Sequence, residues 1–213
     1  MRTDDLIAAL AADTHPVPRA VPQRRLAAAA AFGAPVALVL VLAWLKLRPD
    51  LGAAVAGSMF WMKAGYTAAL GASAFWAAER LGRPGVSAGK AWTVLGLVAV
   101  VFIAAGLVQF AGLSGEARMP TLRGGSWTVC SVNILILGAP MTVAGLLALR
   151  SLAPTRPALA GFAVGVFSGG VAATVYGLHC PEATVVFVSL WYTLGIAACG
   201  LLGALAGRWA LRW

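Results

Sequence analysis

Six long apolar blocks follow one another along the chain after its first two dozen residues. Each block is about 20 residues long, which is the length of helix that crosses the hydrocarbon core of a bilayer. Lys and Arg residues lie mainly at the ends of the blocks. The pattern predicts six transmembrane helices, near residues 26–45, 57–78, 91–112, 127–149, 158–177 and 183–207.

The first 25 residues have a different pattern. Residues 1–12 predict a short helix with Thr3 as its N-cap, and residues 15–23, with three prolines, predict a semi-rigid tether. The acidic first turn and apolar face of the helix consist of Asp4, Asp5, Leu6, Ile7 and Leu10. A helix this short is marginal in water, so it needs a surface to bind; a frayed terminus is the alternative. We therefore divide the chain into a partner-binding segment, 1–25, and a six-helix membrane domain, 26–213.

Composition agrees with a chain that lies mostly in lipid. Hydrophobic residues make up 61% of the sequence and charged residues 11%, whereas a soluble domain has about 25% charged residues. The net charge of +9 does not indicate nucleic-acid binding, because the basic residues flank apolar blocks instead of forming a cluster. We expect an all-α, polytopic membrane protein that makes no direct contact with nucleic acid.

The distribution of basic residues predicts the orientation. Eleven Lys and Arg residues lie on the side that holds both termini, and four lie on the other side. Positive residues are retained in the cytoplasm. We therefore expect both termini to be cytoplasmic in a bacterial inner membrane.

Small residues recur at every fourth position in the last two blocks. The stripes are Gly161, Gly165, Gly169, Ala173 and Gly177, and then Gly195, Cys199, Gly203 and Gly207. Such stripes let two helix backbones approach closely in lipid. The two helices are expected to pack on each other or across a homodimer, with Cys199 as a packing residue.

Two cysteines are predicted to face the outer, oxidising side. Cys130 begins the fourth block, and Cys180 lies in the short connection between the fifth and sixth blocks. They would form a disulfide if the bundle brought their Cα atoms within about 7 Å. Together with His179 and Glu182 they are also candidate ligands for a transient metal ion. The structural alternative is that the thiols are small interfacial residues and that His179 and Glu182 are polar tips of a turn.

Lys63 is the one charge well inside a block. Intramembrane ionisable residues are functional candidates, but Lys63 lies near the outer end, so its side chain would also be able to snorkel to the headgroups. If it is functional, Asp50 and Glu182 are the outer carboxylates best placed to pair with it.

Several short motifs together resemble a known family. They are Thr3-Asp4-Asp5-Leu6-Ile7, Leu47-Arg48-Pro49-Asp50-Leu51, Lys63, Trp127 with Cys130, the Leu149-Arg150 to Arg156-Pro157 connection, Leu178-His179-Cys180-Pro181-Glu182 and Trp191-Tyr192. The sequence is similar in these motifs to the six-helix NrsF-like anti-sigma factors of proteobacteria, over almost the whole chain.

The resemblance implies a regulator rather than an enzyme. It implies that the N-terminal segment holds an extracytoplasmic-function sigma factor at the membrane through Asp4, Asp5, Leu6, Ile7 and Leu10. It also implies that Cys130 and Cys180, with His179, Glu182 and Lys63 around them, sense a periplasmic redox or metal signal, with no resident cofactor.

Two other classes fit less well. A small-solute transporter usually carries acidic or broken-helix sites at the bilayer midplane, and the predicted spans have no internal Asp or Glu. A membrane thiol redox enzyme would use Cys180, His179 and Glu182, but the chain offers few further catalytic groups.

Overall fold

The computed structural model describes residues 2–12, 18 and 20–212, and all regular structure in them is helical. The elements are α1 (Thr3–Ala12), α2 (Val21–Leu40), η1 (Val41–Leu45), α3 (Leu51–Ala56), α4 (Ser58–Leu81), α5 (Gly89–Gly112), α6 (Gly115–Arg123), α7 (Trp127–Arg150), α8 (Pro157–Tyr176), α9 (Val185–Phe187), η2 (Val188–Tyr192) and α10 (Thr193–Ala210). The two η segments are π-helical turns that continue α2 and lead into α10.

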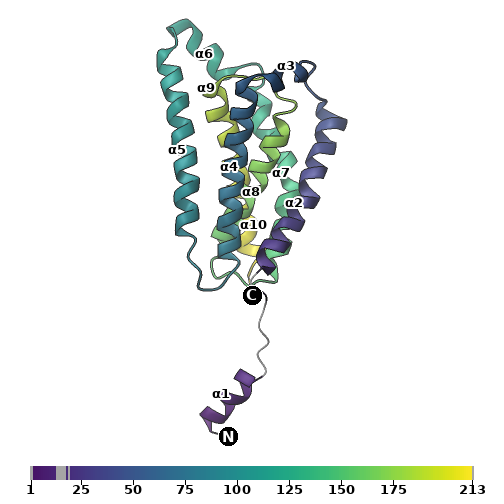
Figure 1. Ribbon diagram of the computed structural model, residues 1–213, viewed down its shortest axis with the longest axis vertical. Helices are drawn as coiled ribbons and strands as arrows, with labels where there is room; N and C mark the ends of the chain where they lie inside the picture. Colours follow the sequence, from purple (N-terminus) through teal and green to yellow (C-terminus); the bar gives the residue numbers. More distant parts are fainter. Residues whose placement is uncertain (1, 13–17, 19, 213) are drawn as a thin grey trace.

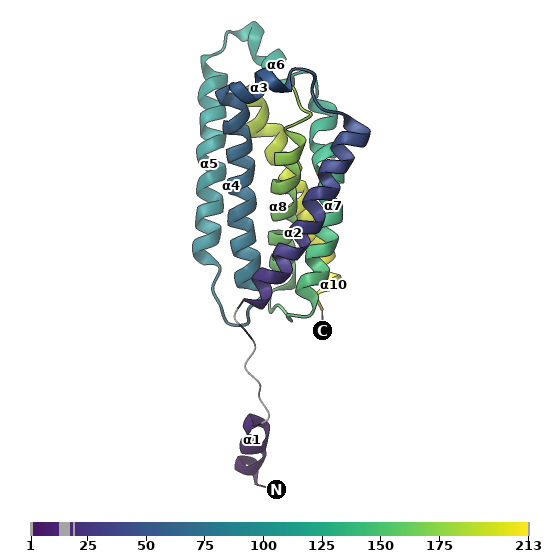
Figure 2. The ribbon, with the colours of Figure 1, turned by 45° about the vertical axis from the view of Figure 1, so that its right-hand side comes forward.

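The long helices form one bundle with α8 at its centre (Figures 1 and 2). Helix α8 packs against α4, α7, α10 and α2, whereas α5 lies at the edge and packs on α4 and α9. The start of α2 and the end of α10 lie at the same end of the bundle, and α3 and α6 lie at the opposite end (Figure 1). We call these the terminal end and the loop end.

Five of the six predicted membrane helices are confirmed as long and apolar enough to span a bilayer. They are Val21–Leu45, Gly89–Gly112, the helix ending at Arg150, Pro157–Tyr176 and Val185–Ala210. Helix α4 has the necessary length, at 24 residues, but it is more polar than the others. Its side chains Lys63, Thr67, Ser73 and Glu79 are all buried in the bundle. Membrane crossing by α4, the sixth predicted span, therefore remains a prediction. The polar side chains of this helix are covered by the rest of the bundle.

The two stripes of small residues pack on each other within one chain. A Cβ atom on Gly161 would collide with the carbonyl of Gly203, and one on Gly165 would collide with the carbonyl of Cys199. The backbones of α8 and α10 therefore touch, as close packing in lipid requires. Cys199 is buried in this seam, which agrees with its predicted packing role.

The short N-terminal helix is confirmed, although its cap differs from the prediction. Helix α1 begins at Thr3, so Thr3 is not the N-cap; the Asp5 carboxylate instead accepts the backbone N–H of Arg2 at 3.3 Å. This hydrogen bond satisfies the backbone N–H of the residue directly before the helix. Helix α1 buries none of its residues and lies apart from the bundle (Figures 1 and 2).

The predicted tether is shorter than expected. Pro22 and Gln23 belong to the first turn of α2, where proline's missing N–H costs nothing. Pro16, the first proline of the tether, lies outside the described residues.

The α8–α10 seam gives a test of the packing. Gly165→Val would place a branched side chain against the backbone of α10, and we expect it to destabilise the bundle by about 2 kcal/mol or more, as overpacking does. Gly96→Val is the matched control, because a Cβ atom on Gly96 meets open space. Thermal unfolding in detergent measures both variants, and equal loss of stability would contradict the seam.

Candidate functional site, a buried cluster of thiols and a lysine

The two predicted sensor cysteines meet at the loop end of the bundle. Cys130 lies in the first turn of α7, and Cys180 lies in the connection between α8 and α9. Both side chains are buried and both thiols are free. Both thiols belong to one buried cluster of side chains, and the Ser126 hydroxyl lies 3.8 Å from the Cys180 sulfur. The bundle thus supplies the spatial contact that the sequence alone left open.

Lys63 points into the turn that carries Cys180. Its ammonium group donates to the carbonyl of Cys180 at 3.0 Å and to the carbonyl of Glu182 at 3.2 Å, and it lies over the ring of Tyr192. The side chain is 2% exposed, so it does not snorkel. The predicted pairing with carboxylates is wrong, because Asp50 and the Glu182 carboxylate have other partners and backbone carbonyls solvate the charge instead.

The loop after α2 holds the same turn from another side. The Arg48 guanidinium donates to the carbonyl of Cys180 at 3.3 Å and forms an ion pair with Asp50 at 2.7 Å. The carbonyl of Lys46 lies 2.8 Å from Nδ1 of His179. Lys46 itself has a φ of 68°, a strained conformation for a non-glycine residue, and such strain is common near functional sites.

The Glu182 carboxylate fastens the turn to the start of α7. It accepts the backbone N–H of Gly125 at 2.7 Å and both the N–H and the hydroxyl of Ser126 at 3.2 Å. A carboxylate is favourable at the positive end of a helix dipole. Gly124 has a φ of 55° and is so close to Glu182 that a Cβ atom would collide with the carboxylate, so glycine is required there.

Two tyrosines close the cluster on its inner side. The hydroxyl groups of Tyr176 and Tyr192 are buried without a hydrogen-bond partner, and the two rings lie 5.8 Å apart. Tyr192 ends the π-helical segment η2, and π-turns are frequent at functional sites. Two polar groups left unpaired beside two thiols mark this region as a site rather than ordinary core.

Cys180 is the more reactive of the two thiols. The neighbouring Cys130 thiol lowers the pKa of Cys180, burial opposes this shift, and the positive charge of Lys63 lowers the pKa further, below that of an ordinary thiol. Thiolate is the nucleophilic form of cysteine, so Cys180 is activated near neutral pH.

The four predicted metal ligands do not converge. The His179 ring contacts the carbonyl of Lys46, and the Glu182 carboxylate contacts Gly125 and Ser126. Among the described residues no group of three or more His, Cys, Asp or Glu side chains is arranged to hold a metal ion. The predicted ligand set of Cys130, His179, Cys180 and Glu182 is therefore not assembled, because the His179 and Glu182 side chains stabilise the turn itself.

Sequence reasoning missed four members of the cluster. Arg48, Ser126, Tyr176 and Tyr192 were not predicted as site residues. Arg48 carried a signal, since a basic residue beside Pro49 and Asp50 at a helix end suits a fixed turn. From the sequence alone, Tyr176 and Tyr192 cannot be distinguished from interfacial packing residues. Only the structure places them beside the thiols.

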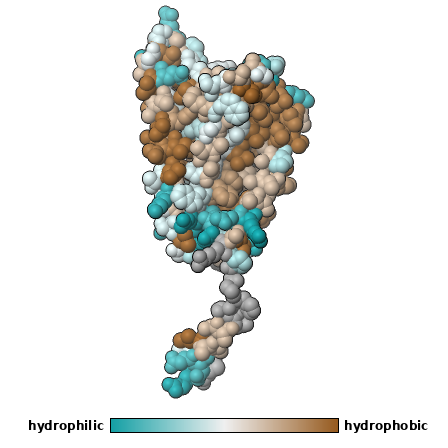
Figure 3. Space-filling model, in the orientation of Figure 1, coloured by the Kyte–Doolittle hydropathy of each residue, from teal (hydrophilic) through white to brown (hydrophobic). Residues whose placement is uncertain are grey.

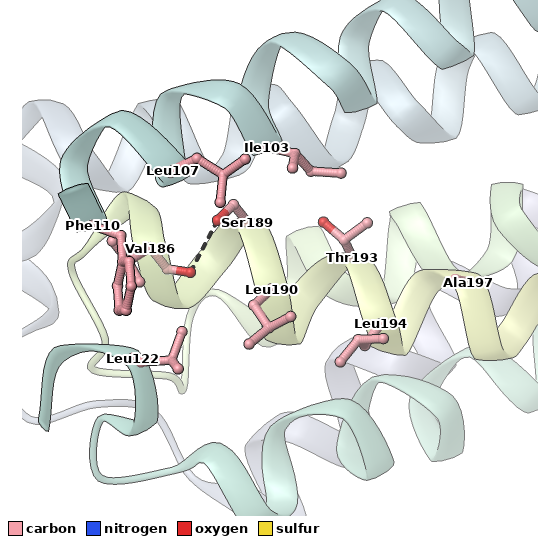
Figure 4. Close-up of a pocket in the computed structure, with 11 residues that line it drawn as sticks. Ile103, Leu107, Phe110, Leu122, Val186, Ser189, Leu190, Thr193, Leu194 and Ala197 are labelled. Carbon is pink, nitrogen blue, oxygen red and sulfur yellow. Dashed lines mark hydrogen bonds between the residues drawn. The ribbon is translucent and has the colours of Figure 1, made fainter. Parts of the chain in front are cut away.

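Apart from the thiol cluster, a cavity of about 360 Å³ lies between α5 and α10 (Figure 4). Its walls are mostly aliphatic, and the Ser189 hydroxyl in it is satisfied by the carbonyl of Val186 at 3.0 Å. No charged or titratable side chain lines this cavity, so it offers room for an apolar chain but no chemistry.

The comparison with known proteins agrees with this architecture. Residues 10–213 match the family described as NrsF, negative regulator of sigma F. The chain belongs to the NrsF family. It is 54% identical to an anti-sigma-F factor NrsF of Caulobacter vibrioides and 39% identical to a probable anti-sigma-F factor NrsF of Azospira oryzae, each over the full length of both chains.

No solved structure matches the chain. The family match covers the whole membrane domain and both cysteines. It confirms the family that the short motifs indicated.

Removing the Lys63 charge tests the architecture of the cluster. Lys63→Met removes the donor to the carbonyl of Glu182 and leaves the carbonyl of Cys180 with Arg48 alone; loss of a buried hydrogen-bond partner typically costs about 1–3 kcal/mol. We expect a lower thermal midpoint and slower maleimide labelling of Cys180 in the purified protein, because loss of the positive charge raises the pKa of that thiol and leaves less thiolate. Lys46→Met is the control, since only the backbone of that residue contacts the turn. Labelling that is unchanged in Lys63→Met would contradict the role of the ammonium group.

The pH dependence of alkylation tests the activation of Cys180. In a Cys199→Ser background, the rate of Cys180 alkylation by iodoacetamide should rise with pH through a midpoint below that of an ordinary thiol, because thiolate increases above the pKa. Cys130→Ala removes the strongest cause of the shift and should move the midpoint upward. A midpoint near 9 in the parent protein would show that Cys180 is an ordinary thiol.

Proposed function

We propose that this chain is a membrane-bound anti-sigma factor that holds an extracytoplasmic-function sigma factor through α1 and releases it on a redox or metal signal at Cys130 and Cys180. The observation that carries the proposal is the full-length 54% identity to an anti-sigma-F factor, together with a thiol pair at the bundle end opposite α1. A regulator of this kind needs no catalytic centre.

Helix α1 is suited to bind a partner protein. Leu6, Ile7 and Leu10 are 42%, 59% and 65% exposed, although they share one face of the helix. An amphipathic helix with an unburied apolar face is a common ligand for a hydrophobic groove. Asp4 and Asp5 precede that face and would contact basic residues at the rim of the groove.

The charge distribution supports cytoplasmic termini in an inner membrane. Ten of the eleven basic residues assigned to the inner side belong to the α1 segment or to described segments at the terminal end, and Arg19 lies outside the described residues. The four on the other side belong to segments at the loop end (Figure 1). With this orientation α1 lies in the cytoplasm, and the thiols lie near the periplasmic surface, where disulfides persist.

A peroxide is the class of oxidant that the thiol pair would use. The Cys180 thiolate attacks one peroxide oxygen and breaks the O–O bond, which yields a sulfenic acid and hydroxide or alcohol. The Cys130 sulfur then displaces water from that sulfenic acid and forms the disulfide. The protein loses two electrons and the peroxide gains them, so a thiol reductant is needed to reset the switch.

A thiophilic cation is the alternative signal. Two adjacent sulfur atoms are the soft ligands that such ions prefer, and binding would release the thiol protons. Within the described residues no third His, Cys, Asp or Glu side chain joins the two thiols in a metal-binding arrangement, so an ion bound there would have the two sulfur atoms as its ligands.

Both signals would act on the same contacts. A bond or an ion between the two sulfurs changes the spacing of the start of α7 and the Cys180 turn, which Glu182 and Lys63 connect to α7 and α4. Helices α7, α8 and α10 pack against each other, so a shift at this turn would move them as neighbours.

Substitutions on α1 test partner retention. Leu6→Asp and Leu10→Asp place a charge on the apolar face and should abolish co-purification of a sigma factor from membranes. Ala8→Asp introduces the same charge on the opposite face and should retain the partner. If deletion of residues 1–15 loses no protein, the anti-sigma proposal is wrong.

Substitution of the thiols tests the sensor. Cys130→Ser, Cys180→Ser and the double variant should retain the sigma factor when membranes are treated with peroxide or cadmium, whereas the parent protein releases it. Cys199→Ser is the matched control and should respond like the parent. Unchanged release in all three sensor variants would refute the cysteine mechanism.

A further inference from the structure

A polar cleft opens at the terminal end of the bundle, far from the thiol cluster. It has a volume of about 370 Å³ and lies between the α4–α5 loop and the α7–α8 loop. Arg83, Ser87 and Trp92 line it from one side, and Thr155 and Arg156 line it from the other. Nothing in the sensor mechanism uses these residues.

The cleft is strongly basic. Its lining includes two guanidinium groups and no carboxylate. An adjoining cleft that shares Ser87 is lined by Arg80 and Lys90, and another that shares Arg156 is lined by Arg208 and Arg212. Figure 3 shows a hydrophilic band over this end of the bundle, below the apolar belt.

Glu79 is the one acidic residue of the described bundle at this end, and it is already paired. It is 4% exposed and forms an ion pair with Arg83, with Arg80 at 4.0 Å as a second partner. This contact also fixes the Arg83 side chain at the wall of the cleft. The Nε atom of Arg83 is buried and has no hydrogen-bond partner. The cleft therefore has one fixed guanidinium group in its wall and a second, that of Arg156, on its other side.

The level of the cleft indicates which anion it would meet. Helices α5 and α8 both begin beside it, at Gly89 and Pro157, and both are apolar enough to span a membrane. The cleft thus lies where the hydrocarbon layer ends and lipid phosphates begin, and Trp92 in its wall is typical of that boundary.

We propose that this cleft binds the headgroup of an anionic phospholipid, with the phosphate between Arg83 and Arg156. Hydroxyl groups of Ser87 and Thr155 would complete the donor set, and Trp92 would contact the glycerol backbone. Basic pockets between membrane helices are known to hold such headgroups. This site is independent of the proposed sensor and requires only that the bundle lies in a membrane.

The test uses the full chain purified in mild detergent with equal amounts of phosphatidylglycerol and phosphatidylcholine. Native mass spectrometry measures which lipid stays bound. We expect phosphatidylglycerol to be retained in preference, and Arg156→Gln to reduce its retention about fivefold, which is the usual contribution of one cation near a lipid surface. Arg83→Lys preserves the charge next to Glu79 but removes the planar donor, and a smaller reduction is expected. Arg118→Gln on α6, at the loop end, is the matched control and should leave retention unchanged.

Three outcomes would overturn the proposal. The first is equal retention of the two lipids, and the second is equal loss in Arg156→Gln and Arg118→Gln. The third comes from a parallel arm with inorganic phosphate: if phosphate alone raises the thermal midpoint as much as phosphatidylglycerol does, and Arg156→Gln removes that effect, the cleft binds a soluble anion. Retention of a sigma factor is measured in the same preparations, so a lost lipid with a retained partner leaves the anti-sigma proposal intact.

Discussion

The ammonium group of Lys63 is buried without a carboxylate, and the loop end of the bundle is organised around its solvation. A buried charge is costly unless dipoles replace its water. Here the carbonyls of Cys180 and Glu182 do so at 3.0 and 3.2 Å, and the ring of Tyr192 covers the remaining side. The carbonyls help only while the turn keeps one conformation, so the turn must be fixed by other contacts.

Those other contacts come from two separate parts of the chain. Arg48 and Lys46 hold the turn from the loop after α2, and the Glu182 carboxylate binds the start of α7. These contacts fix the position of the Cys180 thiol relative to Cys130, Lys63 and the Ser126 hydroxyl. A chemical change at that sulfur would be transmitted to α4 and α7 because both helices contact the turn directly.

Much of this architecture follows from sequence pattern, and the exceptions have clear physical reasons. The helix positions, the α1 segment and the small-residue seam agree with hydrophobic periodicity, whereas the contact between Cys130 and Cys180 is seen only in the structure. The partners of Lys63 could not be predicted from the sequence, because every residue has a backbone carbonyl and none stands out as an acceptor. The carboxylates of Asp50 and Glu182 were therefore the only partners that the sequence suggested. For the same reason His179 and Glu182 looked like metal ligands, although their partners are backbone atoms and the Ser126 hydroxyl.

The polarity of α4 has a consequence for how the chain is made. A lone helix with Lys63 and Glu79 enters lipid at a cost of about 3 kcal/mol for each charge near its centre, and less near its ends. Helix α8, which covers much of its buried face, is synthesised about 80 residues later. Helix α4 therefore gains its main neighbour only late in translation, and assembly of the membrane domain waits for the fifth long apolar segment to emerge from the ribosome.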